Sequence, residues 1–95
     1  MALITVIVAY DVSDDDRRAR LAALLQSVGD RIQKSVFLLQ IEPDDLDHLM
    51  TTSAGLIAAD TDSIYAIRNC AACWSRIQLL GQATPPGKEL FWAAL

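Results

Sequence analysis

The sequence lacks several features on which enzymes and membrane proteins commonly depend. Its 95 residues include one histidine, two cysteines, four glycines and three prolines. No glycine-rich phosphate loop is present, and no set of serine, cysteine and histidine has a recognisable nucleophile spacing. The longest apolar run, residues 2–10, is interrupted by Thr5 and is far shorter than the about 20 residues of a membrane-spanning helix. Metal-assisted hydrolysis is then the most economical enzymatic mechanism, because a metal ion activates water without a protein base.

The length and composition predict one small domain that associates with a partner. A domain of this size buries only about 60–65% of its unfolded surface, yet 53% of the residues are hydrophobic. We therefore expect part of the apolar surface to be covered by another protein. Residues 1–81 are predicted to form the domain, and residues 82–95, with Pro85-Pro86-Gly87 and an apolar end, a docking tail. No secretory signal pattern is present, so we expect a cytoplasmic protein.

The first third of the chain predicts a strand followed by a helix. Leu3 to Tyr10 is short and rich in isoleucine and valine, which is typical of a strand buried on both faces. Ser13 offers an oxygen to cap a helix, and Asp14 to Asp16 fill its first turn, where the helix dipole favours carboxylates. Gly29 suits the position just past the carboxyl end of this helix. Its apolar stripe is Leu21, Leu24, Leu25 and Val28.

The rest of the chain predicts an antiparallel sheet. Residues 31–41 are extended, and Lys34-Ser35 is either a tight turn between two strands or part of one long bent strand. Pro43 suits the first position of a second helix, whose stripe continues through Leu46, Leu49, Met50, Ser53 and Ile57. Two strands are predicted after it, at Ser63–Arg68 and Arg76–Leu80. This order predicts an α/β (α+β) fold of the ferredoxin-like type, with two helices on one face and an extra C-terminal strand.

Asp11 and a cluster of arginines are the candidates for chemistry. Asp11 directly follows the first strand, where functional carboxylates are common. Arg17 and Arg18 are expected to point toward it, because helical side chains lean toward the amino terminus. A carboxylate that holds a hard metal ion, beside arginines that bind phosphate, suits a phosphodiester substrate. Alternatively, Asp11 only caps the helix and the arginines are solvated and pair with Asp14 to Asp16.

The charge distribution favours a local nucleic-acid surface although the net charge is −4. Five of the eight basic residues fall within residues 17–34 and predict a basic patch. They are Arg17, Arg18, Arg20, Arg31 and Lys34.

Cys70 and Cys73 have the C-x-x-C spacing of zinc and redox sites. Zinc needs four ligands, and the one histidine, His48, lies in a different segment, where we interpret it as a surface residue. Free, partly buried thiols are the prediction, and a metal or redox role is the alternative.

Three segments, taken together, resemble the CRISPR-associated protein 2 family. They are Tyr10-Asp11-Val12-Ser13-Asp14, then Arg17, Arg18 and Arg20, and then Arg31-Ile32-Gln33-Lys34-Ser35-Val36-Phe37. Asp62-Ser63-Ile64-Tyr65 and Leu79-Leu80-Gly81 also look like later strands of that family, so the resemblance spans about residues 3–81. The resemblance depends on the order and spacing of these segments. Leu38-Leu39 and the apolar tail depart from the family pattern.

The resemblance implies a ferredoxin-like homodimer that works with the CRISPR integrase and nucleic acid during spacer acquisition. The tail, because it is apolar, is expected to dock on the partner protomer or the integrase. Members are described as magnesium-dependent endonucleases of RNA or double-stranded DNA. By position, Asp11 matches the catalytic, metal-binding aspartate, which each protomer supplies to a shared Mg²⁺. Nucleic-acid binding is assigned to Arg17, Arg18, Arg20 and Arg31, and site integrity to Tyr10 and Phe37.

Four hypotheses about function remain open at this point. The first is a metal-dependent endonuclease, and the second is a non-catalytic DNA-binding scaffold of the integration complex. The third is a toxin-like ribonuclease of similar fold, and the fourth is a small-molecule regulatory module.

Overall fold

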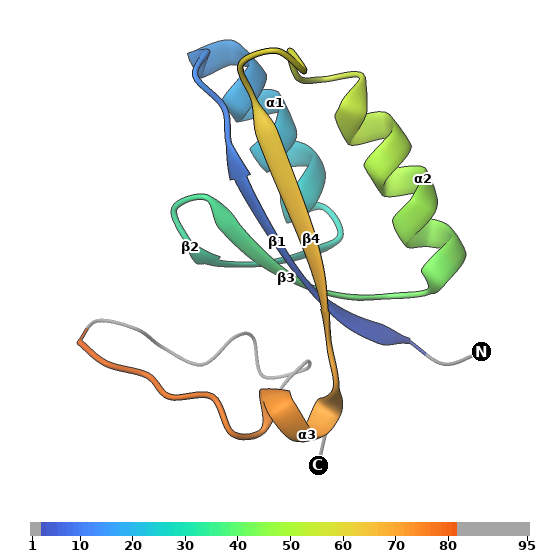
Figure 1. Cartoon of the computed structure of the whole chain (residues 1–95), viewed down its shortest axis with the longest axis vertical. Helices are drawn as coiled ribbons and strands as arrows, with labels where there is room; N and C mark the ends of the chain where they lie inside the picture. The colour runs from blue at the N-terminus through green and yellow to red at the C-terminus, as the bar shows by residue number, and fades with distance from the viewer. Residues whose placement is uncertain (1–2, 82–95) are drawn as a thin grey trace.

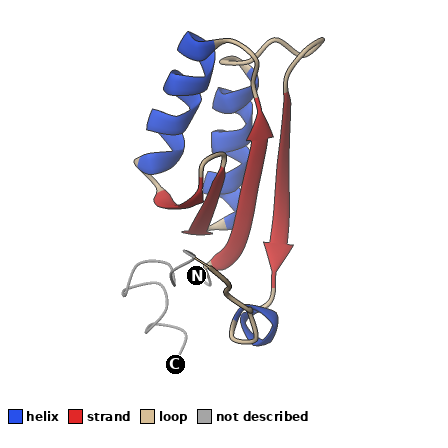
Figure 2. Cartoon of the chain, turned by 90° about the vertical axis from the view of Figure 1, so that its left-hand side faces the viewer, coloured by secondary structure: helices blue, strands red, loops and turns tan. Residues whose placement is uncertain are grey.

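The fold is a four-stranded antiparallel sheet with two helices packed on one face (Figures 1 and 2). The computed structural model describes residues 3–81. Its elements in chain order are β1 (Ile4–Asp11), α1 (Asp15–Gln26), β2 (Gly29–Gln33), β3 (Val36–Ile41), α2 (Pro43–Ala54), β4 (Ser63–Asn69) and α3 (Ala71–Trp74). The strand order in the sheet is β2-β3-β1-β4. The predicted ferredoxin-like arrangement is confirmed for these four strands and two long helices.

The helix-covered face of the sheet carries the core. Along β1, Val6, Val8 and Tyr10 are buried, because alternate residues of a strand share one face. On β3, Leu39 is the register partner of Val6 and Phe37 is the register partner of Val8, and both are fully buried. Helix α1 contributes Leu21 and Leu25 to the same cluster, and α2 contributes Leu46 and Leu49.

Within residues 3–81 no long helix covers the opposite face of the sheet, as Figure 2 shows edge-on. Ile7 of β1 lies between Leu38 of β3 and Ile67 of β4, and Tyr65 of β4 is the partner of Ala9. Leu38 is fully buried, but Tyr65 and Ile67 are 64% and 54% exposed. The prediction that the first strand is buried on both faces is therefore only half right, since its second face is half-buried.

Helix α1 begins one residue later than predicted. Asp14, not Ser13, is the N-cap, and its carboxylate accepts a hydrogen bond from the Arg17 backbone N–H at 2.9 Å. Gly29 does not cap the other end, which closes at Ser27. It begins β2, where an added Cβ would lie 2.2 Å from Leu39 Cδ2, so glycine is needed there for close packing.

The central and second helical segments follow the predictions more closely. Lys34 and Ser35 form a turn between β2 and β3, which decides the open question in favour of two strands. Pro43 is the first residue of α2, and Gly55 caps its end. None of the helices within residues 3–81 has the length and apolar character that crossing a membrane requires.

The strand predicted at Arg76–Leu80 is not formed. After β4 the chain enters α3, where the Trp74 N–H donates to the Cys70 carbonyl at 3.0 Å. This helical turn redirects the chain, and the following segment runs away from β4 (Figure 1) without regular structure. Within residues 3–81 the sheet therefore ends at β4. The predicted docking tail, residues 82–95, lies outside the described residues.

Candidate functional site

Asp11 is the last residue of β1 and lies on the face of the sheet opposite α1 and α2. Its register partner is Ser63, the first residue of β4. The neighbouring Tyr10 points into the core, so Asp11 points the other way, and it is exposed. The predicted metal ligand is thus accessible at the end of the central strand.

Tyr10 and Phe37 support this strand end from the opposite face. Their rings stack with centroids 6.3 Å apart and planes 22° apart, and both residues are buried. The Tyr10 backbone N–H also donates to the Ser35 carbonyl at 3.0 Å. The Arg31 guanidinium lies 5.1 Å from the Phe37 ring centroid, within cation–π range. These contacts are consistent with the predicted role of Tyr10 and Phe37 in site integrity.

Arg17 and Arg18 do not surround Asp11 as expected. Arg17 Nε donates to the Asp62 carboxylate at 3.0 Å. Arg18 donates to the Val12 carbonyl at 2.9 Å and pairs with Asp15. Arg18 therefore reaches the backbone directly after Asp11, but neither guanidinium makes a contact with the Asp11 carboxylate in the described part of the chain.

Asp62, which the sequence did not single out, joins three segments of the chain. Besides Arg17, its carboxylate accepts hydrogen bonds from the Ser13 N–H at 3.2 Å and the Ala58 N–H at 2.9 Å. The side chain is fully buried. The hydrogen bond from Arg17, followed by that from Ala58, holds the pKa of Asp62 well below its usual range. Asp62 thus anchors the β1–α1 connection, which directly follows Asp11, to the start of β4.

A groove on the helix side of the strand end gathers part of the basic cluster. It has a volume of about 260 Å³ and is lined by Tyr10, Asp15, Arg18, Ala19, Ala22, Arg31 and Lys34. Three cations converge there, and guanidinium groups bind phosphate oxygens in bidentate geometry. Arg20 is exposed on α1 but does not line this groove, and Arg17 is held by Asp62. Arg18, Arg31 and Lys34 of the predicted patch therefore line one groove, whereas Arg17 and Arg20 do not line it.

One chain offers only part of a metal site at Asp11. Within residues 3–81, no three side chains of histidine, cysteine, aspartate or glutamate are grouped to hold an ion. Mg²⁺ is commonly bound by one or two carboxylates with water completing the shell. Exposed Asp11 suits such a site if a second copy supplies the other carboxylate. His48 is exposed on α2 and is not in such a group.

Comparison with known sequences agrees with this geometry. A family model described as CRISPR associated protein Cas2 matches residues 4–77. The CRISPR-associated endoribonuclease Cas2 1 of Chloroflexus aurantiacus is 33% identical over 81 residues, or 84% of this chain and 87% of the relative. A relative with the same name from Archaeoglobus fulgidus is 40% identical over 70 residues, or 73% and 74% of the two chains.

Solved structures lead to the same family. A hypothetical protein from Thermus thermophilus superposes with a TM-score of 0.79 at 30% identity, covering 90% of this chain and 99% of that one. Streptococcus pyogenes Cas2 gives 0.75 at 28% identity, covering 81% and 99%. A chain of a partial Cas6-RT-Cas1–Cas2 complex gives 0.56 at 28% identity, covering 66% and 77%. Because the family model spans nearly the whole described domain, and relatives at 33% and 40% identity cover more than two thirds of the chain, the chain belongs to the CRISPR-associated protein Cas2 family.

Proposed function

We propose that the chain acts in CRISPR spacer acquisition as a homodimeric, magnesium-dependent endonuclease and as a bridge within the integrase complex. Relatives at 33% and 40% identity are named endoribonucleases, which supports a phosphodiester substrate. A similar chain occurs in a complex with Cas1, which supports an integrase partner. RNA is the first substrate to test because of those names, and duplex DNA is the second.

The exposure of Asp11 on the uncovered sheet face is the observation that carries this proposal. A carboxylate that only caps a helix would accept backbone N–H groups, yet Asp14 performs that role here. Asp11 ends β1, whose helix-facing side is buried, and is itself exposed and available to a ligand. Its position therefore favours a role outside the stability of the single chain.

The apolar residues on the same face support a homodimer. Tyr65 and Ile67 of β4 are more than half exposed, and Ile7 of β1 lies beside Ile67. A two-fold axis over this face would cover these residues, because an isologous interface uses the same patch twice. It would also bring the two Asp11 side chains toward each other. The pair would then hold Mg²⁺, which supplies an activated water and neutralises charge on the phosphate.

The groove lined by Arg18, Arg31 and Lys34 supports binding of the nucleic-acid backbone. It lies on the helix side of the strand end, whereas Asp11 points to the other face. Phosphate contacts in the groove would position the strand without reading its sequence. Cleavage then requires the backbone to pass around the end of β1 to the Asp11 side.

The experiment compares the wild type and Asp11→Ala on RNA and on duplex DNA, with Mg²⁺ and with chelator. We expect the substitution to reduce Mg²⁺-dependent cleavage by at least about 100-fold while circular dichroism and thermal unfolding stay unchanged. Asp47→Ala is a matched control, because Asp47 is an exposed carboxylate on α2. Full activity of highly purified Asp11→Ala would overturn the assignment of the site.

The separation of the groove from Asp11 also favours a second function, a non-catalytic DNA-binding scaffold of the integrase complex. On this hypothesis the groove holds DNA and Asp11 is not required. An integration assay with the integrase separates the two functions. Normal integration by Asp11→Ala, with loss of integration when Arg18 and Arg31 are replaced by alanine, would favour the scaffold.

A further inference from the structure

The C-x-x-C segment adjoins the sheet and forms a defined helical turn. Cys70 directly follows β4, and Cys73 lies within α3. The Trp74 N–H donates to the Cys70 carbonyl at 3.0 Å and the Arg76 N–H to the Cys73 carbonyl at 3.1 Å. Residues three apart in a helical turn lie on the same side, so the two thiols face each other.

The two sulfur atoms are already in contact. The Sγ atoms lie 3.0 Å apart in a thiol–thiol hydrogen bond, and the Cys73 backbone N–H donates to Cys70 Sγ at 3.2 Å. Both residues are exposed, which corrects the prediction of partly buried thiols. A covalent bond between sulfurs measures about 2.05 Å, so an approach of about 1 Å by side-chain rotation is sufficient.

A structural zinc ion does not suit this pair. Tetrahedral zinc sites use four protein ligands, and the two thiols supply two. In the part of the chain that the structure describes, no third cysteine, histidine or acidic residue joins them. The contact between the sulfurs therefore favours their reaction with each other.

We propose that Cys70 and Cys73 are a redox-active dithiol that exchanges with low-molecular-weight disulfides of the glutathione type. The Cys70 thiolate attacks one sulfur of the incoming disulfide, forms a mixed disulfide and releases one thiolate. Cys73, deprotonated as it reacts, attacks Cys70 Sγ, closes the Cys70–Cys73 disulfide and releases the second thiolate. The protein loses two thiol protons and two electrons, and the small disulfide takes them up and is reduced to two thiols.

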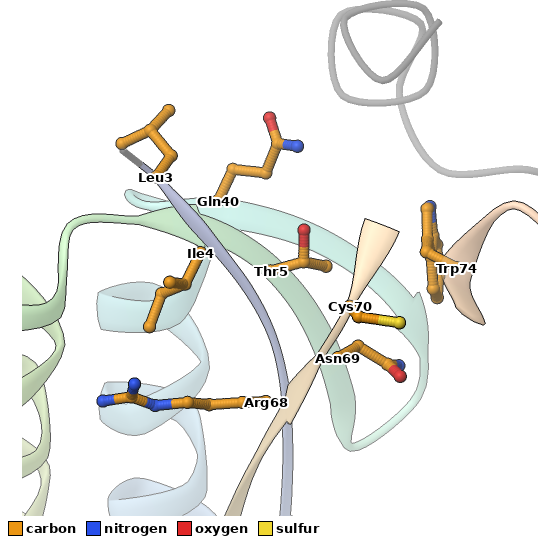
Figure 3. Close-up of a pocket in the computed structure, with 8 residues that line it drawn as sticks. All are labelled: Leu3, Ile4, Thr5, Gln40, Arg68, Asn69, Cys70 and Trp74. Carbon is orange, nitrogen blue, oxygen red and sulfur yellow. The ribbon is translucent and has the colours of Figure 1, made fainter. Parts of the chain in front are cut away.

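The surroundings indicate which cysteine attacks first. The hydrogen bond with the Cys73 side chain, helped by the Cys73 backbone N–H, lowers the pKa of Cys70. The same side-chain contact raises the pKa of Cys73. Cys70 also lines an open hollow of about 450 Å³ together with Thr5, Gln40 and Trp74 (Figure 3). This hollow gives a small disulfide access to Cys70 Sγ, and Cys73 is the resolving residue.

The test equilibrates the full chain in mixtures of reduced and oxidised glutathione, traps it with acid and measures its intact mass. We expect the oxidised wild type to be lighter by about 2 Da, from the loss of two hydrogens, and to carry no glutathione. Cys73→Ser should accumulate one glutathione on Cys70. Cys70→Ser should react with oxidised glutathione roughly tenfold more slowly, because the thiolate is the nucleophile.

A spacing control keeps the number of thiols constant. The double variant Cys73→Ser with Ser75→Cys moves the second thiol two residues along, away from the side that Cys70 faces. We expect it to carry glutathione adducts at ratios where the wild type is fully closed. The proposal is overturned if the wild type stays reduced or carries two glutathiones at every ratio, or if the spacing control closes as readily. Circular dichroism checks that each variant remains folded.

Discussion

The two faces of the sheet differ in how far one chain completes them. On the helix side, Val6, Val8, Phe37 and Leu39 are fully buried beneath α1 and α2. On the other side, Tyr65 and Ile67 are more than half exposed, and Asp11 is exposed at the strand end. The helix side therefore determines whether the chain folds. We infer that the open side determines which partners and ligands the folded chain binds.

The largest effect on folding is expected on the helix side. Phe37→Ala should lower the free energy of unfolding by about 3–5 kcal/mol, because it removes a fully buried ring and its stacking with Tyr10. Urea unfolding at two protein concentrations measures this loss and separates it from any change in association. Phe37→Leu is the control and should cost roughly 1.5 kcal/mol or less, since it retains most of the volume. A loss below about 1 kcal/mol for Phe37→Ala would contradict the closed character of this face.

A charge on the open side should act on association instead. Ile67→Asp should raise the dissociation constant of the proposed dimer by at least about 100-fold, or about 2.7 kcal/mol, because the proposed two-fold interface would bury the carboxylate twice. Sedimentation velocity across a range of concentrations measures the change. Ile67→Thr is the control, because it keeps the branched shape without the charge and should weaken association less. If Ile67→Asp left a dimer intact, the interface would have to lie elsewhere.

Gly29 tests how tightly the helix side is filled. Gly29→Ala should destabilise the fold by about 1–3 kcal/mol, because its Cβ would lie 2.2 Å from Leu39 Cδ2 and 2.4 Å from the Leu38 carbonyl oxygen. At Gly55 the nearest atom to an added Cβ, the Thr52 carbonyl oxygen, is 3.4 Å away, so Gly55→Ala should be neutral or slightly stabilising. Thermal unfolding of the two variants compares the positions. If Gly29→Ala were as stable to heat as Gly55→Ala, β2 would have to move to accept the methyl group at position 29.

The smallest expected effect concerns Asp62, which directly precedes β4, and it depends on pH. Arg17 lowers the pKa of Asp62 in the folded chain. The stabilisation that the ionised Asp62 gives the fold is therefore fully present above a pH of about 3.9, the pKa of aspartate in an unfolded chain. It is lost as the pH falls from there through the folded pKa. The stability difference between the wild type and Asp62→Asn should therefore be constant near neutral pH and shrink below about pH 4.

Urea unfolding between pH 7 and pH 3 measures this difference. Asp16→Asn serves as the control, because Asp16 is exposed in the first turn of α1. A difference between the wild type and Asp62→Asn that grows on acidification would contradict the direction of the pKa shift.

Local patterns predicted most elements of the fold. The isoleucine- and valine-rich run marked β1, Pro43 marked the start of α2, and the stripe through Leu21 and Leu25 marked the buried side of α1. The wrong cap, Ser13 for Asp14, arose because two adjacent residues can both accept the same N–H. The strand predicted at Arg76–Leu80 failed because α3 turns the chain before it.

The candidate site was less predictable than the fold, because its contacts are long-range. Arg17 and Asp62 are separated by 45 positions, and no local pattern pairs them. One feature of the sequence could have predicted that Asp11 lies apart from the arginines. Tyr10 is a large apolar residue at the end of an alternating strand, so its neighbour Asp11 must point away from the helices.

The position of β1 in the sheet also bears on how the protein is made. β1 is synthesised before β3 and β4, yet it lies between them in the sheet, and β4 is the last strand within residues 3–81. The β2–β3 hairpin closes through a two-residue turn and can form locally, whereas the β1–β4 pairing joins residues such as Val8 and Ala66 that are far apart in the sequence. Until Asn69 has left the ribosome, one edge of β1 has no strand beside it. An open edge of this kind recruits other chains, so the interval between synthesis of β3 and of β4 is when the nascent protein is most prone to aggregate.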